Sequence, residues 1–143
     1  MIIPLWVTKT YNSLQYQGGI TLNIDFNNVV PIYIQIANAI EDDILSGKLG
    51  EGDNCYSQLI LSKELNINPA TAAKGIRLLV ERGVLNKNRG LSMIVCSDAK
   101  VQIKARKKEE ILNTIVENLV TDAKKLEISE NELISIIKTY YKG

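Results

Sequence analysis

The chain has 143 residues, of which 45% are hydrophobic, and a formal net charge of +1. This length allows one domain, or one small domain with an appendage, and the apolar content allows a packed core. There is no histidine, and the only cysteines, Cys55 and Cys96, lack CxxC spacing. These counts argue against a zinc site and exclude a nucleophile paired with histidine. No Walker or dinucleotide-binding motif occurs, so we expect neither an enzyme nor a cofactor.

The sequence gives no indication of a membrane protein. No apolar run approaches the roughly 20 residues that a membrane span requires. The first residues, MIIPLWVTK, lack the basic flank and long apolar centre of a signal peptide. Two free thiols also suit a reducing compartment. We therefore expect a cytoplasmic protein that has no membrane partner.

Residues 1–25 differ from the rest of the chain because they show no sustained hydrophobic period. Within them, residues 20–24 alternate apolar and polar side chains, which is compatible with a short strand. We interpret residues 1–25 as a loosely held N-terminal arm, or as sequence that lies ahead of the natural start.

A first helix is predicted to begin at Pro31, because a first-turn proline has no intrahelical N–H bond to lose. The acidic residues 41–43 lie off its apolar stripe, and Gly47 can end it in a left-handed conformation. A glycine-punctuated turn around Leu49 follows. The stripe recurs at three- and four-residue spacing and consists of Ile32, Ile36, Ala39, Ile40 and Ile44.

Two more helices are predicted on either side of a turn at residues 66–67. Ser57 is suited to cap a helix over residues 58–65, and Asn68 followed by Pro69 marks the start of the next helix. Gly83 ends that helix. Its apolar face consists of Ala72, Ile76, Leu79 and Val80, and another face carries Thr71, Lys74, Arg77 and Glu81.

A β-hairpin is predicted after this helix, with strands at residues 84–87 and 93–96 and a turn between them. From residue 99 the chain is expected to be helical again. The basic run at residues 104–108 either contacts DNA backbone or is the solvated start of this helix, and we prefer the second reading. Ser129 and Glu132 have the spacing of a capping box for a last helix.

The two C-terminal helices carry apolar stripes that they cannot bury on each other alone, so a second copy of the chain is the economical partner. A pocket for a small molecule between the tail helices is left open. The residues expected at the dimer interface are Ile111, Leu112, Ile115, Leu119, Leu133, Ile137 and Tyr140.

The order of these elements resembles the GntR superfamily of bacterial transcriptional regulators, and the short two-helix tail resembles its YtrA-type subfamily. The resemblance covers about residues 26–96. It implies a winged helix-turn-helix and, for the subfamily, a dimerisation tail. Departures from the family pattern stand at Tyr56, Leu59, Gly75, Ser92 and Ile94. The matching segments are PIYIQI from Pro31, ILSGKL from Ile44, LNINPAT from Leu65, LVERG from Leu79, and Arg89-Gly90.

Six residues are candidates for contact with DNA. Ser57 and Thr71, at helix starts, are expected to meet phosphate, the alternative being a local backbone hydrogen bond. Lys74 is expected at a guanine edge or a phosphate, and Arg77 at a phosphate, the alternative for each being a solvated side chain. Arg89, beside Gly90, suits insertion into the minor groove, although an ordinary turn arginine is the alternative.

The sequence thus predicts a mainly α fold with a small β-hairpin wing. Residues 26–98 would form a winged helix-turn-helix, and residues 99–143 a helical dimerisation tail. The expected function is that of a sequence-specific transcription regulator, a repressor that binds a palindromic operator in double-stranded DNA as a homodimer. The alternative is a winged-helix protein-interaction module with reduced or lost DNA affinity. Whether a small-molecule effector exists is left open.

Overall fold

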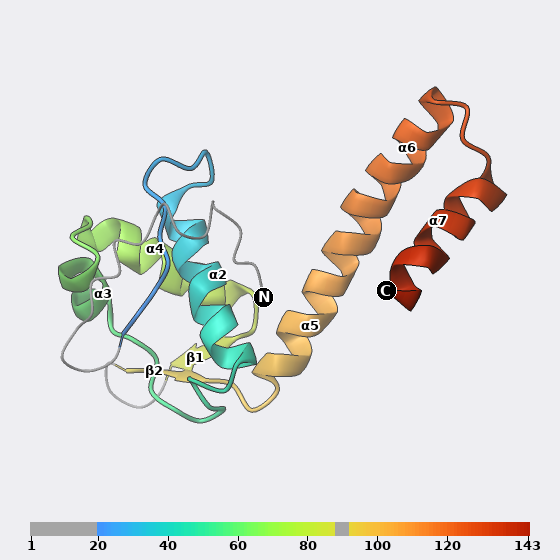
Figure 1. Ribbon diagram of the computed structural model, residues 1–143. Coiled ribbons are helices and arrows are strands. Elements are labelled where there is room, and N and C mark those ends of the chain that lie inside the picture. The colour runs from blue at the N-terminus through green and yellow to red at the C-terminus, as the bar shows by residue number, and fades with distance from the viewer. Residues whose placement is uncertain (1–19, 88–91) are drawn as a thin grey trace. The chain divides into compact units, whose positions relative to one another are not determined.

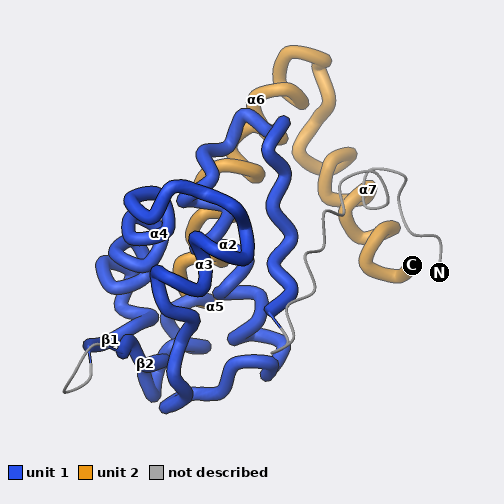
Figure 2. The backbone as a smooth tube through the Cα atoms, turned by 90° about the vertical axis from the view of Figure 1, so that its left-hand side faces the viewer, with its two compact units in different colours: residues 1–103 blue, residues 104–143 orange. Residues whose placement is uncertain are grey.

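The computed structural model describes residues 20–87 and 92–143 (Figure 1). The chain divides after Ile103 into two compact units, residues 1–103 and 104–143 (Figure 2). Helices with one two-stranded antiparallel hairpin confirm the predicted fold class. The first unit contains α2 (Ile32–Leu45), α3 (Gln58–Glu64), α4 (Pro69–Glu81), β1 (Leu85–Lys87), β2 (Met93–Val95) and the start of α5 (Ala99–Glu110). The second contains the rest of α5, the π-helix η1 (Ile111–Val116), α6 (Glu117–Lys125) and α7 (Glu130–Lys142).

The core of the first unit is built on the apolar stripe of α2, where Ile36, Ile40 and Ile44 are fully buried, as predicted. Leu61 of α3 and Leu79 of α4 pack into the same cluster. The predicted boundary at residue 98 differs from the observed one, because Ala99 and Ile103 at the start of α5 also belong to this core. Val80 was expected on the apolar face of α4 but is 40% exposed.

Glu41 corrects the prediction that the acidic residues 41–43 lie off the buried stripe. Its side chain is 0% exposed, and its carboxylate accepts a hydrogen bond from the guanidinium of Arg82. The same guanidinium donates to the side-chain oxygen of Asn38 at 3.1 Å. Arg82 therefore joins the end of α4 to α2 and is not part of a free basic surface.

Residues 20–24 form part of the core and are not a loose arm. Ile20, Leu22 and Ile24 are buried in alternation, although the segment pairs with no strand in the described part of the chain. Gln35 of α2 holds the segment at its end. It accepts from the Asp25 N–H at 2.8 Å and donates to the Asp25 carbonyl oxygen at 2.9 Å. The remaining residues of the predicted arm, 1–19, lie outside the described residues.

Gly75 allows α4 to approach α2 closely. A Cβ at this position would lie 3.1 Å from the carbonyl oxygen of Tyr33 and 3.1 Å from Cγ2 of Ile36. Glycine inside a helix costs about 1 kcal/mol relative to alanine, so this contact explains why the small residue stands here.

We expect the Gly75→Val substitution to lower the free energy of unfolding by about 1–3 kcal/mol, because the added carbons overpack the contact between α2 and α4. Urea titration followed by circular dichroism measures the change. The control is Ala70→Val, at an exposed position of the same helix. An equal loss in both variants would mean that only the helix propensity of valine matters, and not the space around residue 75.

The wing is larger than the predicted hairpin. Leu85 pairs with Val95 and Lys87 with Met93, as antiparallel partners. A third segment, which the sequence suggested was only a turn, runs along the other edge of β2. There the Gly52 N–H donates to the Val95 carbonyl oxygen at 2.8 Å, and the Cys55 N–H to that of Met93 at 2.8 Å. The loop between α2 and α3 is thereby tied to the hairpin.

The second unit buries little of its apolar surface. Among its described side chains only Ala123 is buried, and η1 replaces part of the continuous α-helix that was expected. Ser129 caps α7 as predicted, since its Oγ accepts from the Glu132 N–H at 3.2 Å. None of the helices in the described ranges has both the length and the apolarity for crossing a bilayer.

Candidate nucleic-acid interface

The helix-turn-helix is shaped by two side-chain caps and one strained turn. The Ser57 Oγ accepts a hydrogen bond from the Ile60 N–H at 3.1 Å and starts α3. The Asn68 Oδ1 accepts from the Ala70 N–H at 2.8 Å and starts α4, with Pro69 at the first helical position. Between them Asn66 has a φ of 51°, in the left-handed region that asparagine tolerates better than most residues. Both predicted caps are confirmed.

The outer face of α4 carries the predicted cations. Lys74 and Arg77 are exposed, and Thr71 is half-buried. The ammonium nitrogen of Lys74 lies 4.0 Å from the centroid of the Tyr33 ring, within the range of a cation–π interaction. Helical periodicity does not predict this contact, because Tyr33 belongs to α2 and lies 41 positions earlier in the chain. The aromatic ring steadies a side chain that would otherwise sample many rotamers.

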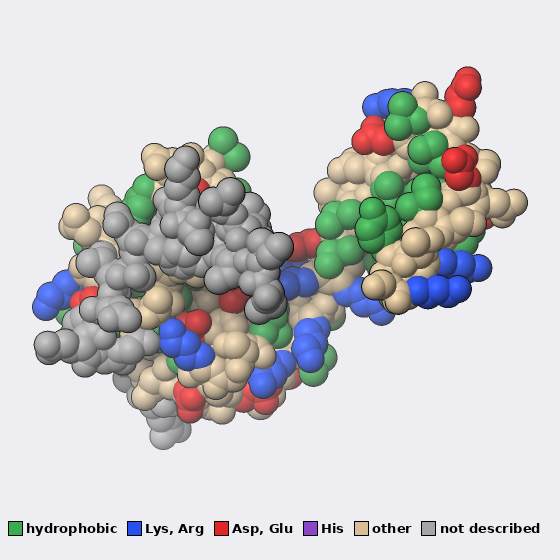
Figure 3. All heavy atoms as spheres, viewed as in Figure 1, with side chains coloured by type: hydrophobic (Ala, Val, Ile, Leu, Met, Phe, Trp, Pro, Cys, Tyr) green, Lys and Arg blue, Asp and Glu red, His purple; other side chains and the backbone are tan. Residues whose placement is uncertain are grey.

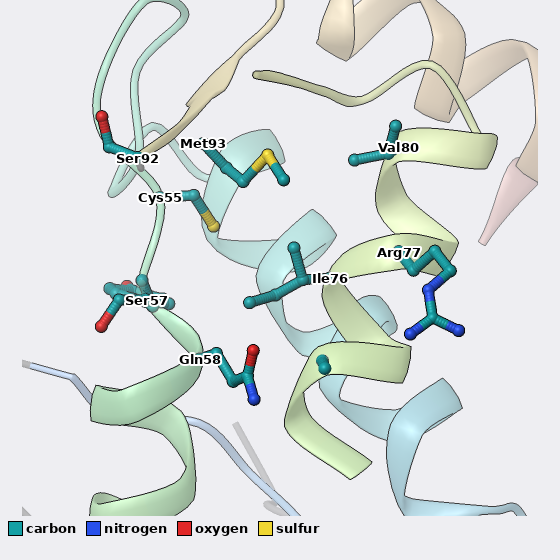
Figure 4. A pocket seen from close by; sticks show the side chains of 10 residues that line it. Cys55, Ser57, Gln58, Ile76, Arg77, Val80, Ser92 and Met93 are labelled. Atoms are coloured by element: carbon teal, nitrogen blue, oxygen red, sulfur yellow. The ribbon is translucent and has the colours of Figure 1, made fainter. Parts of the chain in front are cut away.

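A groove of about 380 Å³ separates the start of α3 from α4 and the wing (Figure 4). Ser57 and Gln58 stand on one side, and Ile76, Arg77 and Val80 on the other. Two of the predicted site residues, Ser57 and Arg77, line this groove from opposite sides, and the Arg77 guanidinium points away from Ser57 (Figure 4). Thr71 and Lys74 lie on α4 but do not line this groove, and Arg89 and Gly90 lie outside the described residues. Gln58 also lines the groove, although no sequence motif marks it as a site residue.

Tyr56 explains one departure from the family pattern. Its hydroxyl donates to the Asp43 Oδ2 of α2 at 2.7 Å. The Lys48 ammonium lies 3.7 Å from the same carboxylate oxygen. Burial, followed by the hydrogen bond with Asp43, raises the pKa of Tyr56 above its ordinary value, so the hydroxyl stays a donor. This bond fixes the chain immediately before Ser57, and hence the start of α3.

Known proteins of similar sequence and fold are transcriptional regulators. A crystal structure of a GntR-family transcriptional regulator from Bacteroides thetaiotaomicron is 30% identical, with a TM-score of 0.66 over 78% of this chain and 96% of that one. The chain belongs to the GntR family. A GntR-family regulator from Listeria monocytogenes is 28% identical, with a TM-score of 0.60 over 80% of this chain and 98% of that one.

A third relative of this GntR-family protein is the HTH-type transcriptional regulator YhcF of Bacillus subtilis (strain 168). It is 25% identical over 118 residues, which make up 82% of this chain and 96% of YhcF. No family model matches the chain. The relatives are regulators of transcription and not enzymes, so this member of the GntR family is classed as a regulator as well.

The tail of this GntR-family protein carries the second predicted site. Six of its seven predicted interface residues are exposed, and Leu133 is half-buried. Hydrophobic side chains gather along this unit in the space-filling view (Figure 3). The π-helix η1 contains three of the seven predicted interface residues. Such π-helical turns are rare and frequently mark functional sites. The exposed six are Ile111, Leu112, Ile115, Leu119, Ile137 and Tyr140.

Cys55, in the wall of the groove, is expected to make this GntR-family protein less stable in alkali. The pKa of its thiol is raised from an ordinary value of 9.0 to about 12, mainly because the thiol is buried. Above pH 9 the unfolded thiol loses its proton while the folded one keeps it. The free energy of unfolding should therefore fall by up to about 1.4 kcal/mol per pH unit between pH 9 and 12.

Urea titrations at pH 8 and pH 10 test this expectation, with Cys55→Ala as the comparison. Between pH 8 and pH 10 the free energy of unfolding should fall by about 1 kcal/mol less in Cys55→Ala than in the wild type. Other groups titrate in both proteins, so the informative quantity is the difference between the wild type and Cys55→Ala in how much the free energy of unfolding falls. Equal falls would show that the Cys55 thiol does not contribute.

Proposed function

We propose that this chain is a sequence-specific DNA-binding regulator that places α4 in the major groove of double-stranded DNA. The observation that carries the proposal is the exposed outer face of α4, with Lys74 and Arg77 on a helix whose start is capped by Asn68. A capped recognition helix preceded by a short helix is the arrangement that helix-turn-helix proteins insert into the major groove. Ser57 and Thr71 are proposed phosphate contacts, and Arg89 with Gly90 a minor-groove contact from the wing.

The charge around α4 supports this proposal. Four described cations are exposed on or beside the helix-turn-helix and the wing, while Arg82 is engaged by Glu41. Cations that are free to face solvent can release condensed counterions from DNA, which is the main source of sequence-independent affinity. The four residues are Lys63, Lys74, Arg77 and Lys87.

We expect Lys74→Ala to weaken binding to a selected operator about tenfold, because one base or phosphate contact contributes about 1–3 kcal/mol. Fluorescence anisotropy with a duplex selected from a random library measures it. The control, Lys124→Ala, removes one exposed charge from α6 and should bind as the wild type does. Arg89→Ala should weaken operator and random duplexes alike. Unchanged affinity in both α4 and wing variants would remove these side chains from the interface.

We further propose a homodimer that acts as a repressor at a pseudo-palindromic operator, with residues 99–143 as the dimerisation tail of a YtrA-type member. The support is the set of exposed apolar side chains on the tail, since contiguous apolar surface on a protein usually marks an interaction site. A dimer with two-fold symmetry would meet half-sites about one helical turn apart.

A small-molecule effector is a separate proposal. A shallow pocket that could receive it on the tail is lined by Ile137, Tyr140 and Tyr141.

A second candidate function is a protein-interaction module with reduced DNA affinity. The observation that favours it is Leu59, an apolar side chain on α3 that is 74% exposed. Salt dependence separates the two functions. A DNA binder that neutralises Z phosphates loses affinity with a log–log slope of about −0.9Z, whereas no binding to a random-library pool at 50 mM salt would favour the interaction module.

A further inference from the structure

The outer face of α4, which is proposed for the major groove, is poor in groups that read adenine. Bidentate recognition of adenine needs both the oxygen and the nitrogen of an Asn or Gln side chain. The only carboxamide at the start of α4 is that of Asn68, and its oxygen is already occupied by the Ala70 N–H at 2.8 Å. Lys74 is held over Tyr33 at 4.0 Å. The polar reading capacity of α4 therefore rests mainly on its cations, which favour guanine and phosphate, while Gln58 supplies an exposed carboxamide at the start of α3.

An exposed apolar group stands in the first turn of each helix of the helix-turn-helix. Leu59, in the first turn of α3, is 74% exposed, and Ala70, in the first turn of α4, is exposed as well. The first turn of α3 borders the groove that α4 lines, because Gln58 stands on one side of it and Ile76 and Arg77 on the other (Figure 4). An exposed leucine beside a groove of this kind gains free energy only where a partner removes it from water.

The major groove of DNA offers one apolar group to such a side chain, the C5-methyl group of thymine. Resting on the DNA-binding function proposed above, we propose that Leu59 contacts thymine methyl groups and makes thymine a specificity determinant of each half-site. The removal of one methyl group from a buried contact costs about 0.8 kcal/mol, which corresponds to about a fourfold loss of affinity.

The test uses operator duplexes selected from a random library, in which single thymines are replaced by deoxyuridine. This replacement removes the C5-methyl group and leaves the base-pairing atoms in place. Binding of the full chain is measured by fluorescence anisotropy at one fixed salt concentration. We expect about a fourfold loss at one or two thymines of each half-site. For at least one of these thymines, the Leu59→Ala variant should bind the thymine duplex and the deoxyuridine duplex with equal affinity.

The matched control is Val101→Ala, which shortens another apolar side chain that is 68% exposed, on α5 of the same unit. It should keep the wild-type preference for thymine. Leu59 is so exposed that its truncation leaves the core unchanged, and a thermal melt verifies the fold. The proposal is overturned if the wild type binds every deoxyuridine duplex as tightly as the thymine duplex, or if Leu59→Ala retains the full preference. If no duplex is selected from the library, the DNA-binding function fails instead.

Discussion

Replacing Arg82 with methionine is expected to lower the free energy of unfolding by about 3–5 kcal/mol. The Glu41 side chain is 0% exposed, and the Arg82 side chain, whose guanidinium donates to the Glu41 carboxylate, is only 17% exposed. Without the guanidinium, the folded state has to hold a carboxylate out of water with much less compensation. The loss is a large part of the 5–15 kcal/mol that stabilises a typical domain. Urea titration at pH 7 measures it.

The double variant Glu41→Leu/Arg82→Met is expected to recover most of this stability, because a buried ion pair can be replaced by packed apolar side chains at little cost. The control is Lys48→Met. Its partner Asp43 lies 3.7 Å away and Lys48 is 39% exposed, so its loss should stay within about 1 kcal/mol. If Arg82→Met is no more damaging than Lys48→Met, the buried pair does not hold α4 on α2.

Ile115→Asp is expected to convert the proposed dimer to a monomer and to weaken binding to the proposed operator by a factor of about 100 or more. Ile115 lies on η1 among the exposed apolar side chains of the tail, and a carboxylate there would have to be desolvated without a partner when two copies associate. Loss of the dimer removes the effective concentration that links the two half-site contacts, which is worth a factor of about 10²–10⁴.

Asn113→Asp is the matched control, because it introduces the same charge in the same helical turn at an exposed polar position. Sedimentation velocity gives the oligomeric state, and fluorescence anisotropy with the selected duplex gives the affinity. Asn113→Asp should remain dimeric and bind as the wild type does. A dimeric Ile115→Asp variant would show that the surface of the tail that contains η1 is not the interface.

Much of the fold was readable from local sequence. Ser57, Asn68 and Ser129 cap helices as predicted. Gly47 and Gly83 have φ values of 85° and 73°, as their place after a last helical turn suggested. These features depend on hydrogen bonds and backbone angles within a few residues. Such local geometry follows from the types of the side chains involved. The apolar period of α2 likewise follows from the geometry of a single helix.

The candidate site was readable only in part. The exposure of Lys74 and Arg77 follows from their position opposite the buried residues of α4, and the sequence pattern shows it. The pairing of Lys74 with Tyr33 and the joint lining of one groove by Ser57 and Arg77 could not be read in this way. They require α4 to be placed against α2 and α3, and that placement depends on Gly75 and on the buried Glu41–Arg82 pair.

The sequence by itself therefore determined where the helices of the winged helix-turn-helix start and stop and which residues face away from its core. Only the tertiary structure decided that an acidic residue is buried, that residues 20–24 complete the core, and that residues 52–55 extend the wing. The physical reason is separation along the chain. Caps and periods act over three or four residues, whereas Glu41 and Arg82, or Gly52 and Val95, meet only after the whole unit has folded.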